Sequence, residues 1–494
     1  MMGLKFWLMI VGSFCLLPPP HNDQEVVLSN LPTPFHQDTI PSDWKIQYPF
    51  LNLDANAIQS PEQLAPFFEK LRQLENGEID RVNIVHIGDS HVQADFWTGD
   101  LRHKFQNRFG AGGRGLIFPY YLAGTNNPLD YRITSNTDEW MARKNAFKPG
   151  APMGISGMSI RTTKPDFRLE ILVKDSLGDD RFNKVTLFNE KSTSSFDYTL
   201  SYGTLQPKEE KPEPVQRQVH RVRKGDTLYD LGRKYGVSVR NLQRWNGLRG
   251  SRLSIGQRLV VKGGTVRRAK PKVDHSKLGL ISNSEYPIFP GPNALEFDTL
   301  LYRLHIQGDR HSDTQKETLI YGISLENTRN SGIVYHSIGV NGATHFHFNQ
   351  SEHFAEAVPW LNPDLIIVSL GTNESVGSDP DVFKFGEEVD LFYQNLADYS
   401  PDVPILVTTN GDILRKRKHP NEGTLPIKNA LVDKAHEHGF AIWDFYELMG
   451  GKGSIKAWQK AGLAHTDFIH FTEAGYALQA DLLYTALMQA YEQH

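Results

Sequence analysis

Cysteine is almost absent from this chain of 494 residues, which contains only Cys15. A scaffold of disulfide bonds is therefore excluded. An excess of charge of one sign is absent too, because 53 lysine and arginine residues stand against 57 aspartate and glutamate residues. This balance gives no reason to expect a nucleic-acid partner. Long apolar runs are missing after the N-terminus, so no transmembrane segment is predicted in the mature chain.

The beginning of the chain has the pattern of a targeting segment. Lys5 precedes an apolar run over residues 6–17, and three prolines follow directly. A charged start, a short apolar run and an abrupt stop are typical of a signal peptide, which we predict at residues 1–20. Export to the periplasm or cell envelope is therefore expected, and the polar residues 21–58 are expected to form a leader or linker. The alternatives are an uncleaved anchor, a buried helix and a lipoprotein attached at Cys15.

Short apolar segments alternate with helical ones in the two outer parts of the chain. Residues 59–119 begin with an amphipathic helix, for which Ser60 is the expected cap, and continue into an apolar strand at 82–87. Residues 331–494 contain further strands and helices, with strands at 365–370, 405–409 and 441–445, and helices at 382–399, 425–438 and 473–492. Short buried strands separated by helices predict a parallel sheet covered on both faces, which is a three-layer α/β fold.

The middle of the chain lacks helical periodicity and has alternating, strand-like segments instead. We predict a β-sandwich there, inserted into the α/β fold in two parts, residues 120–205 and 278–330. Residues 206–218 and 263–277 are rich in charge and in proline or glycine, as linkers are. They enclose a compact segment at residues 219–262, which we expect to be mobile relative to its host.

The enclosed segment is expected to fold in the order β-α-α-β. It has Gly225-Asp226-Thr227-Leu228 after the first strand, an Asn241-Leu242 pair in the second helix and Ile255-Gly256-Gln257 before the last strand. In these features it resembles the LysM domain. That resemblance implies binding of glycans that contain N-acetylglucosamine, in a groove formed by Gly225, Asp226, Thr227, Leu228, Ser254 and Ile255. Leu228 and Ile255 would offer apolar contacts there. The alternative is a module that only spaces or packs, since a fold does not by itself prove a site.

Four short motifs in the outer parts carry groups suited to nucleophilic catalysis. Ser90 follows the strand at 82–87, and Gly342 and Asn373 also follow apolar strands. Asp467 and His470 lie three residues apart just before the last helix, so one loop can present both to the serine. A nucleophilic serine needs a base and a carboxylate that orients the base. It also needs oxyanion donors, for which the Ser90 and Gly342 amides and the Asn373 side chain are the candidates.

Taken together, these motifs resemble the SGNH hydrolase superfamily, whose sheet is flavodoxin-like. The Gly88-Asp89-Ser90-His91 sequence and the stretch from His86 to Gly115 resemble one branch, the peptidoglycan O-acetylesterases, which carry an inserted carbohydrate-binding-like β-domain. The resemblance implies Ser90 as nucleophile, His470 as base and Asp467 as its partner, with Ser90, Gly342 and Asn373 in the oxyanion hole. It implies no cofactor.

The resulting hypothesis is a secreted serine esterase that removes O-acetyl groups from peptidoglycan through an acyl-serine intermediate. An O-acetyltransferase that uses the same residues is an open alternative, because the two differ only in the acceptor. A non-catalytic wall-binding scaffold is the third reading, and the intact Ser90, Asp467 and His470 set argues against it.

Several other polar residues could have either a functional or a structural role. His465 is a weaker candidate for the base, because no aspartate lies three residues before it. His345 and His347 are expected to alternate on a strand, and without a third ligand of clear spacing we predict no metal site. His91 and Asp95 are either pocket residues or ordinary helix residues. Asp89 is expected to brace its turn by hydrogen bonds. Residues 415–418 (RKRK) form either a solvated loop or an attraction site for anionic wall polymers.

Overall fold

The computed structural model describes residues 44–494, apart from 147–151, 175–179, 203–217, 224, 236, 238, 247, 249–252, 263–275, 282–288, 352 and 378. The predicted signal peptide at 1–20, Cys15, residues 21–43 of the predicted leader and most of the two predicted linkers lie outside the described residues. The rest of the predicted leader, residues 44–58, does not form a linker, because Leu53 and Ile58 are buried in the core and Ile58 pairs with Trp443. Within the described part of the chain, no helix combines the length and the apolar character needed to cross a lipid bilayer.

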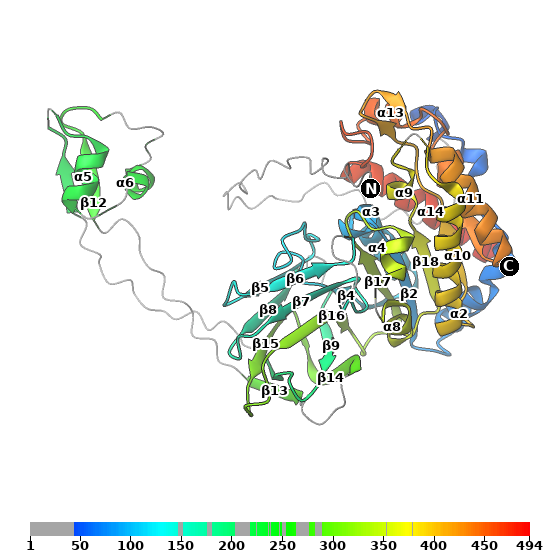
Figure 1. The fold of residues 1–494 in the computed structure, drawn as a ribbon, viewed down its shortest axis with the longest axis horizontal. Coiled ribbons are helices and arrows are strands. Elements are labelled where there is room, and N and C mark those ends of the chain that lie inside the picture. The colour runs from blue at the N-terminus through cyan, green and yellow to red at the C-terminus, as the bar shows by residue number, and fades with distance from the viewer. Residues whose placement is uncertain are drawn as a thin grey trace, which may run out of the picture.

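A mainly parallel sheet, on the right in Figure 1, forms the middle layer of the α/β part of the chain. Its strands are, in spatial order, β1 (Ile58–Gln59), β22 (Ala441–Trp443), β19 (Ile405–Thr408), β18 (Leu365–Ser369), β2 (Arg81–Gly88), β17 (Gly332–Gly339) and β3 (Ala111–Gly113). All neighbours are parallel except the edge pair of β1 and β22. The first long strand, β2, lies between β17 and β18, as in flavodoxin-like sheets.

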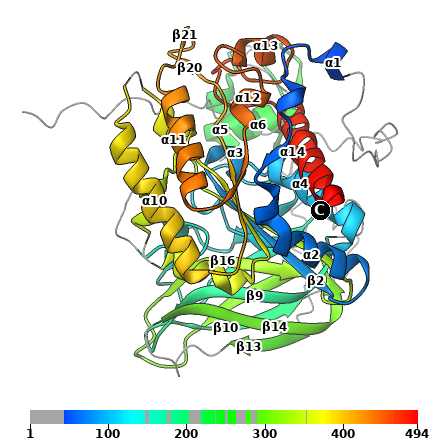
Figure 2. The same cartoon turned by 90° about the vertical axis from the view of Figure 1, so that its right-hand side faces the viewer.

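Helices cover both faces of this sheet because its strands are apolar on both faces. In β2, Val82 and Ile84 belong to one buried cluster, while Val85 and Ile87 belong to the other. Figure 2 shows the two groups of helices on opposite sides. One group comprises α2 (Ala65–Glu75), α4 (Phe96–Phe109) and α14 (Glu473–Gln493), and the other comprises α10 (Val382–Tyr399) and α11 (Thr424–Glu437). The predicted three-layer arrangement is therefore present.

Short elements connect these layers, and two of them differ from expectation. They are α1 (Trp44–Gln47), η1 (Leu53–Ala55), η2 (Pro61–Leu64), α3 (Ser90–Gln93), α7 (His345–Asn349), α8 (Phe354–Ala357), η3 (Val358–Leu361), α9 (Thr372–Ser375), β20 (Leu414–Arg415), β21 (His419–Pro420), α12 (Phe445–Leu448) and α13 (Ile455–Lys460). The predicted cap at Ser60 is wrong, because that residue is left-handed (φ 51°) and its side chain makes no capping bond. The predicted strand at His345 and His347 is also wrong. The Thr344 side chain accepts a hydrogen bond from the His347 backbone and starts a helix there.

The middle of the chain forms two antiparallel sheets. The first has the order β13 (Ser276–Ile281), β10 (Asp197–Tyr202), β15 (Arg303–Asp309), β8 (Arg168–Val173) and β5 (Tyr131–Ser135). The second has the order β14 (Phe289–Leu301), β9 (Phe182–Lys191), β16 (Thr318–Glu326), β7 (Met158–Thr162) and β6 (Met141–Lys144), and β4 (Gly115–Ile117) also pairs with β16. This stretch is therefore rich in strands, as the alternation of its side chains indicated.

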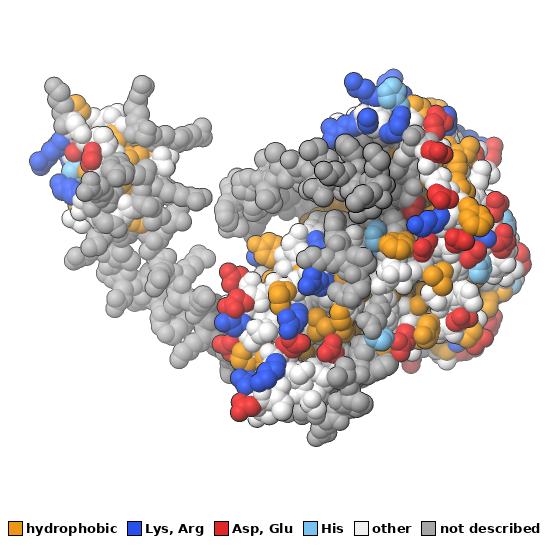
Figure 3. Space-filling model, in the orientation of Figure 1, with side chains coloured by type: hydrophobic (Ala, Val, Ile, Leu, Met, Phe, Trp, Pro, Cys, Tyr) orange, Lys and Arg blue, Asp and Glu red, His pale blue; other side chains and the backbone are white. Residues whose placement is uncertain are grey.

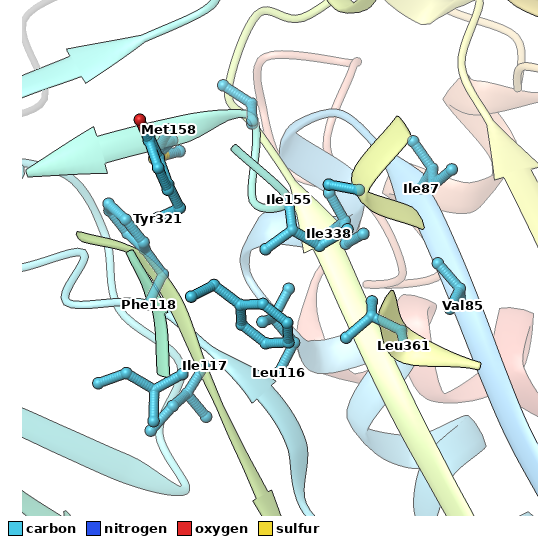
Figure 4. Close-up of a cluster of buried hydrophobic side chains, with 14 of the residues drawn as sticks. Val85, Ile87, Leu116, Ile117, Phe118, Ile155, Met158, Tyr321, Ile338 and Leu361 are labelled. Atoms are coloured by element: carbon cyan, nitrogen blue, oxygen red, sulfur yellow. The ribbon is translucent and has the colours of Figure 1, made fainter. Parts of the chain in front are cut away.

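The β-rich stretch shares a hydrophobic core with the parallel sheet. Figure 4 shows Val85 of β2 and Ile338 of β17 in the same cluster as Leu116 of β4 and as Ile155 and Tyr321 from the middle of the chain. These side chains are all buried. Burial of a continuous apolar surface across the junction is expected to hold the two parts in a fixed relation.

The segment between the predicted linkers has its own small core. It consists of β11 (Gln218–Arg221), α5 (Leu228–Tyr235), α6 (Val239–Asn246) and β12 (Arg258–Lys262), with the two strands paired antiparallel. Its buried side chains are Val222, Leu228, Leu231, Leu242, Leu259 and Val261. The element order β-α-α-β is the one predicted from the sequence.

Candidate active site

Three loops that carry predicted site residues meet at one edge of the parallel sheet. Gly88 at the end of β2 is in register with Gly339 of β17 and with Ser369 of β18. The next turns of these three strands contain Ser90, Gly342 and Asn373 respectively. The carboxyl edge of an open α/β sheet is the place where such folds bind ligands.

Ser90, His470 and Asp467 form a continuous hydrogen-bonded chain. The Ser90 Oγ lies 3.0 Å from His470 Nε2, and His470 Nδ1 lies 2.8 Å from Asp467 Oδ2. A serine bonded to an imidazole that is in turn oriented by a carboxylate is the arrangement of an activated nucleophile. The structure thus brings together the three residues selected from the sequence, although Ser90 is 380 positions from His470.

The Asp467 carboxylate is held in its ionised form. Partial burial opposes ionisation, but hydrogen bonds from the His470 side chain and from the backbone N–H groups of Ile469 and His470 outweigh it. The pKa of Asp467 therefore lies well below its usual range. An ionised carboxylate at Nδ1 leaves Nε2 of His470 to accept the serine proton.

The oxyanion side of the site contains two backbone donors and one side chain. Gly342 is left-handed (φ +79°), a conformation that favours glycine. The backbone N–H groups of Ser90 and Gly342 have no hydrogen-bond partner among the described residues. The Nδ2 atom of Asn373 carries two hydrogens and has two acceptors, Asp89 Oδ2 at 3.0 Å and the Ala343 carbonyl at 2.9 Å.

Asp89 braces this corner, as the sequence indicated. Its Oδ1 atom accepts the His91 backbone N–H at 2.9 Å, and its Oδ2 atom accepts the Asn373 amide. Only 1% of Asp89 is exposed, so the carboxylate connects the nucleophile turn to the Asn373 turn without contacting solvent.

His91 is more involved in the site than the sequence suggested. Its Nδ1 lies 2.9 Å from Asp89 Oδ1, its Nε2 lies 3.2 Å from the Ile469 carbonyl, and its ring stacks on His470 with centroids 5.3 Å apart. Both partners are acceptors, an arrangement that favours the ring form in which both nitrogens donate. Burial lowers the pKa of His91, but Asp89 and the Ile469 carbonyl outweigh burial and raise it above the ordinary value.

Gln93 is a site residue that sequence reasoning missed. Its Nε2 donates to Thr125 Oγ1 at 3.0 Å and to Asn126 Oδ1 at 2.7 Å, and its Oε1 accepts the Asn341 backbone N–H at 2.8 Å. The side chain therefore joins the turn before Gly342 to the β-rich stretch. A glutamine in a short helix has no signal in sequence that distinguishes it from a solvated one.

Two other candidates from the sequence lie outside the catalytic chain. His465 is exposed; its backbone N–H donates to the His470 carbonyl and its own carbonyl accepts the Phe468 N–H. Asp95 is 8% exposed and contacts two buried arginines, Arg102 at 3.0 Å and Arg114 at 2.5 Å. Asp95 is therefore part of a buried ion network and not a pocket residue. The described residues contain no group of three or more side chains arranged to hold a metal ion.

The predicted groove residues of the small module are divided between its surface and its core. Ile255 is 72% exposed, and Ser254 and Gly225 are exposed as well. Asp226 accepts hydrogen bonds from His220 and from the Arg223 backbone, and Thr227 bonds to Asp230, so both side chains hold the turn. Leu228 is 2% exposed and packs inside the module. The predicted apolar contact between the Leu228 side chain and a glycan is therefore wrong.

Comparison with known families gives two matches. Residues 220–262 match the LysM domain, and residues 322–478 match the GDSL-like Lipase/Acylhydrolase family. The second match contains Gly342, Asn373, Asp467 and His470 but begins after Ser90, which the middle of the chain separates from them.

Curated proteins match short stretches of this chain. A 52-residue stretch is 46% identical to membrane-bound lytic murein transglycosylase D of Escherichia coli (10% of this chain, 12% of that protein). A 69-residue stretch is 42% identical to probable endopeptidase p60 of Listeria monocytogenes (13% of this chain, 14% of that protein). This chain thus spans only a small part of the length of these curated relatives.

A solved structure of a peptidoglycan O-acetylesterase is similar over most of the chain. It has a TM-score of 0.61 and 19% identity, and the match covers 87% of this chain and 97% of that one. At this level of identity the match establishes the fold. Both resemblances inferred from the sequence are confirmed: the chain carries a LysM domain and a GDSL-like lipase/acylhydrolase domain, and its fold is that of a solved peptidoglycan O-acetylesterase.

Proposed function

We propose that this protein is a serine esterase that removes O-acetyl groups from cell-wall peptidoglycan. The observation that carries the proposal is the hydrogen-bonded chain from Ser90 through His470 to Asp467 at the carboxyl edge of the sheet. The similar structure named above is a peptidoglycan O-acetylesterase, and the relatives of the LysM domain include a murein transglycosylase. Both similarities support the wall polymer as substrate.

The proposed reaction has two acyl-transfer steps. The Ser90 Oγ adds to the acetyl carbonyl carbon while its proton passes to His470 Nε2, and the oxyanion is held by the N–H groups of Ser90, Gly342 and Asn373. Collapse breaks the bond to the sugar oxygen, which leaves with the proton from His470. Water then attacks the acetyl-Ser90 ester in the same way, giving acetate and restoring the serine.

Acetate release from O-acetylated peptidoglycan tests this function directly. We expect the purified protein to release acetate from the native polymer and none from polymer that has first been de-O-acetylated with mild base. A serine-reactive phosphonate is expected to block release and to label Ser90, as mass spectrometry of the peptides would show. Labelling at another serine, or release that persists in the labelled protein, would contradict the proposal.

A sugar acceptor in place of water would turn the same chemistry into acetyl transfer. Adding de-O-acetylated glycan to the assay and looking for newly acetylated glycan distinguishes the two. We expect acetate to be the product, and acetylated glycan as the main product would favour the transferase instead. The substrate lies outside the cytoplasm, so the proposal also requires export, for which residues 1–20 are the candidate signal.

The LysM domain is proposed to bind the glycan and raise the local concentration of substrate. Deletion of residues 219–262 is expected to raise KM for peptidoglycan by roughly 10-fold or more, because two linked binding sites strengthen each other. Turnover of a small soluble acetate ester should not change, since the module has its own core. An equal loss of kcat/KM for peptidoglycan and for the soluble ester would show that the module supports the catalytic domain structurally.

A further inference from the structure

A tight hairpin of four consecutive cations follows strand β19. The turn runs from Arg415 to Lys418, between β20 and β21, and it closes with a bond of 3.2 Å from the Lys418 N–H to the Arg415 carbonyl. All four side chains are exposed, and none of them forms an ion pair with any residue that the structure describes. We call residues 415–418 the basic hairpin.

The backbone of the basic hairpin does not favour the residues it contains. Lys416 (φ 51°) and Arg417 (φ 60°) are both left-handed. β-turns in which both central residues have positive φ favour asparagine followed by glycine, because those residues tolerate positive φ. Residues held in sparsely populated backbone regions cluster at functional sites. Local folding preference therefore does not explain why two long cationic side chains occupy these positions.

The basic hairpin is attached to the loop that carries the catalytic base. The Leu414 N–H donates to the Phe468 carbonyl at 3.1 Å, and Phe468 lies between Asp467 and His470 in the chain. Leu414 is 3% exposed, so the base of the hairpin is packed and its position is fixed. Figure 2 shows β20 and β21 at the top of the molecule, and Figure 3 shows lysine and arginine side chains gathered there.

We propose that the basic hairpin binds carboxylates of the peptide stems on peptidoglycan and so positions the acetylated sugar at Ser90. This inference rests on the proposed function, because it names the part of that substrate which the cations recognise. Peptide stems present carboxylates at intervals along the polymer, and arginine and lysine pair with carboxylates. Four adjacent positive charges also raise the local concentration of an anionic polymer near the site.

The attraction is electrostatic and acts on binding, not on the chemical step. It is therefore expected to lower KM for the polymer while leaving kcat unchanged, and to weaken as salt shortens the Debye length from about 10 Å at 0.1 M. A small neutral ester has no carboxylate and should not respond to the hairpin. A role of the hairpin in binding should therefore change KM for the polymer but not the turnover of a neutral ester, whereas a purely structural role would affect both substrates.

The decisive variant combines Lys416→Asn with Arg417→Gly in the full-length protein. These substitutions remove two charges but suit the left-handed turn, so the melting temperature should stay the same or rise. We expect KM for O-acetylated peptidoglycan to rise roughly 5- to 10-fold at low salt, with kcat within about twofold. Turnover of a neutral acetate ester should be unchanged, and the dependence of KM on salt should become smaller.

Two controls separate this effect from a general loss of charge and identify the anion. The double variant Lys70→Asn and Lys174→Asn removes two exposed cations elsewhere and should keep the wild-type KM. Wild-type protein on peptidoglycan whose stem carboxylates have been converted to amides should show the raised KM of the hairpin variant. If KM of the hairpin variant equals the wild-type value, or if amidation leaves KM unchanged while phosphate-bearing wall polymer competes, the proposal is overturned.

Failure of the esterase function would give a different pattern. In that case the wild-type protein would release no acetate, and binding would be followed instead by cosedimentation of full-length Ser90→Ala protein with peptidoglycan. The Lys416→Asn and Arg417→Gly substitutions should then reduce binding several-fold at low salt, with the LysM domain present in both proteins. Equal binding of the two proteins would refute the role of the hairpin independently of catalysis.

Discussion

Ser90→Ala is expected to lower kcat for acetate release about 10⁶-fold, and His470→Ala by a similar factor. The two residues act as one unit, because the serine oxygen is a weak nucleophile unless the imidazole 3.0 Å away removes its proton. The double variant should therefore be hardly worse than either single one. Residual release should reflect the oxyanion donors and substrate binding alone.

Asp467→Asn should cost about 10⁴-fold in kcat, because an amide can hold His470 in the wrong tautomer. Stopped assays with sensitive acetate detection on wild type and variants would measure these differences, with thermal melting curves to check folding. His465→Ala is the matched control, since this exposed histidine lies five residues before His470 and should keep wild-type activity. A large loss in that variant together with an active His470→Ala would assign the base to His465.

Asp95→Asn is expected to destabilise the protein by about 3–5 kcal/mol. Asp95 and Asp130 together neutralise two arginines, Arg102 and Arg114, each of which is 1% exposed. Removing one carboxylate leaves a buried positive charge without compensation. Because Asp130 belongs to the β-rich stretch and Asp95 to the α/β part, the loss should affect the junction between them.

Urea denaturation of Asp95→Asn against wild type would measure this loss. Asp402→Asn, at an exposed position, is the control and should change stability by less than about 0.5 kcal/mol. Burial opposes ionisation of Asp95, but Arg102 and Arg114 outweigh it and hold its pKa well below the usual range. Its contribution is therefore fully present above about pH 4 and is lost as the pH falls through the lowered pKa. If Asp95→Asn is as stable as wild type, Asp130 alone is enough to compensate the charges of Arg102 and Arg114.

The sheet and the catalytic chain were predictable because their signals are local. The parallel strands β2, β17, β18, β19 and β22 are short apolar runs, and Ser90, Gly342 and Asn373 follow three of them. Parallel strands end at a common edge, so residues far apart in sequence were expected to meet there. The three-residue spacing of Asp467 and His470 placed both on one loop, and the structure joins them at 2.8 Å.

Other features depend on contacts that sequence patterns do not contain. His345 and His347 alternate as in a strand, but the capping bond from Thr344 makes them helical. Leu228 belongs to a turn motif and yet its side chain fills the core of its module. His91 and Gln93 owe their roles to acceptors and donors on distant segments, the Ile469 carbonyl and the Asn341 amide. Such partners are defined only once the chain has folded.

The hydrogen bonds of Asn373 affect how strongly the proposed enzyme would bind the transition state compared with the ester substrate. Both hydrogens of its Nδ2 are already engaged, one of them by the neutral Ala343 carbonyl. An ester carbonyl that displaced Ala343 would gain nothing, since one neutral acceptor replaces another. An oxyanion would gain, because hydrogen bonds to a charged oxygen are about twice as strong. In this arrangement Asn373 favours the transition state over the bound substrate and would contribute to kcat more than to affinity.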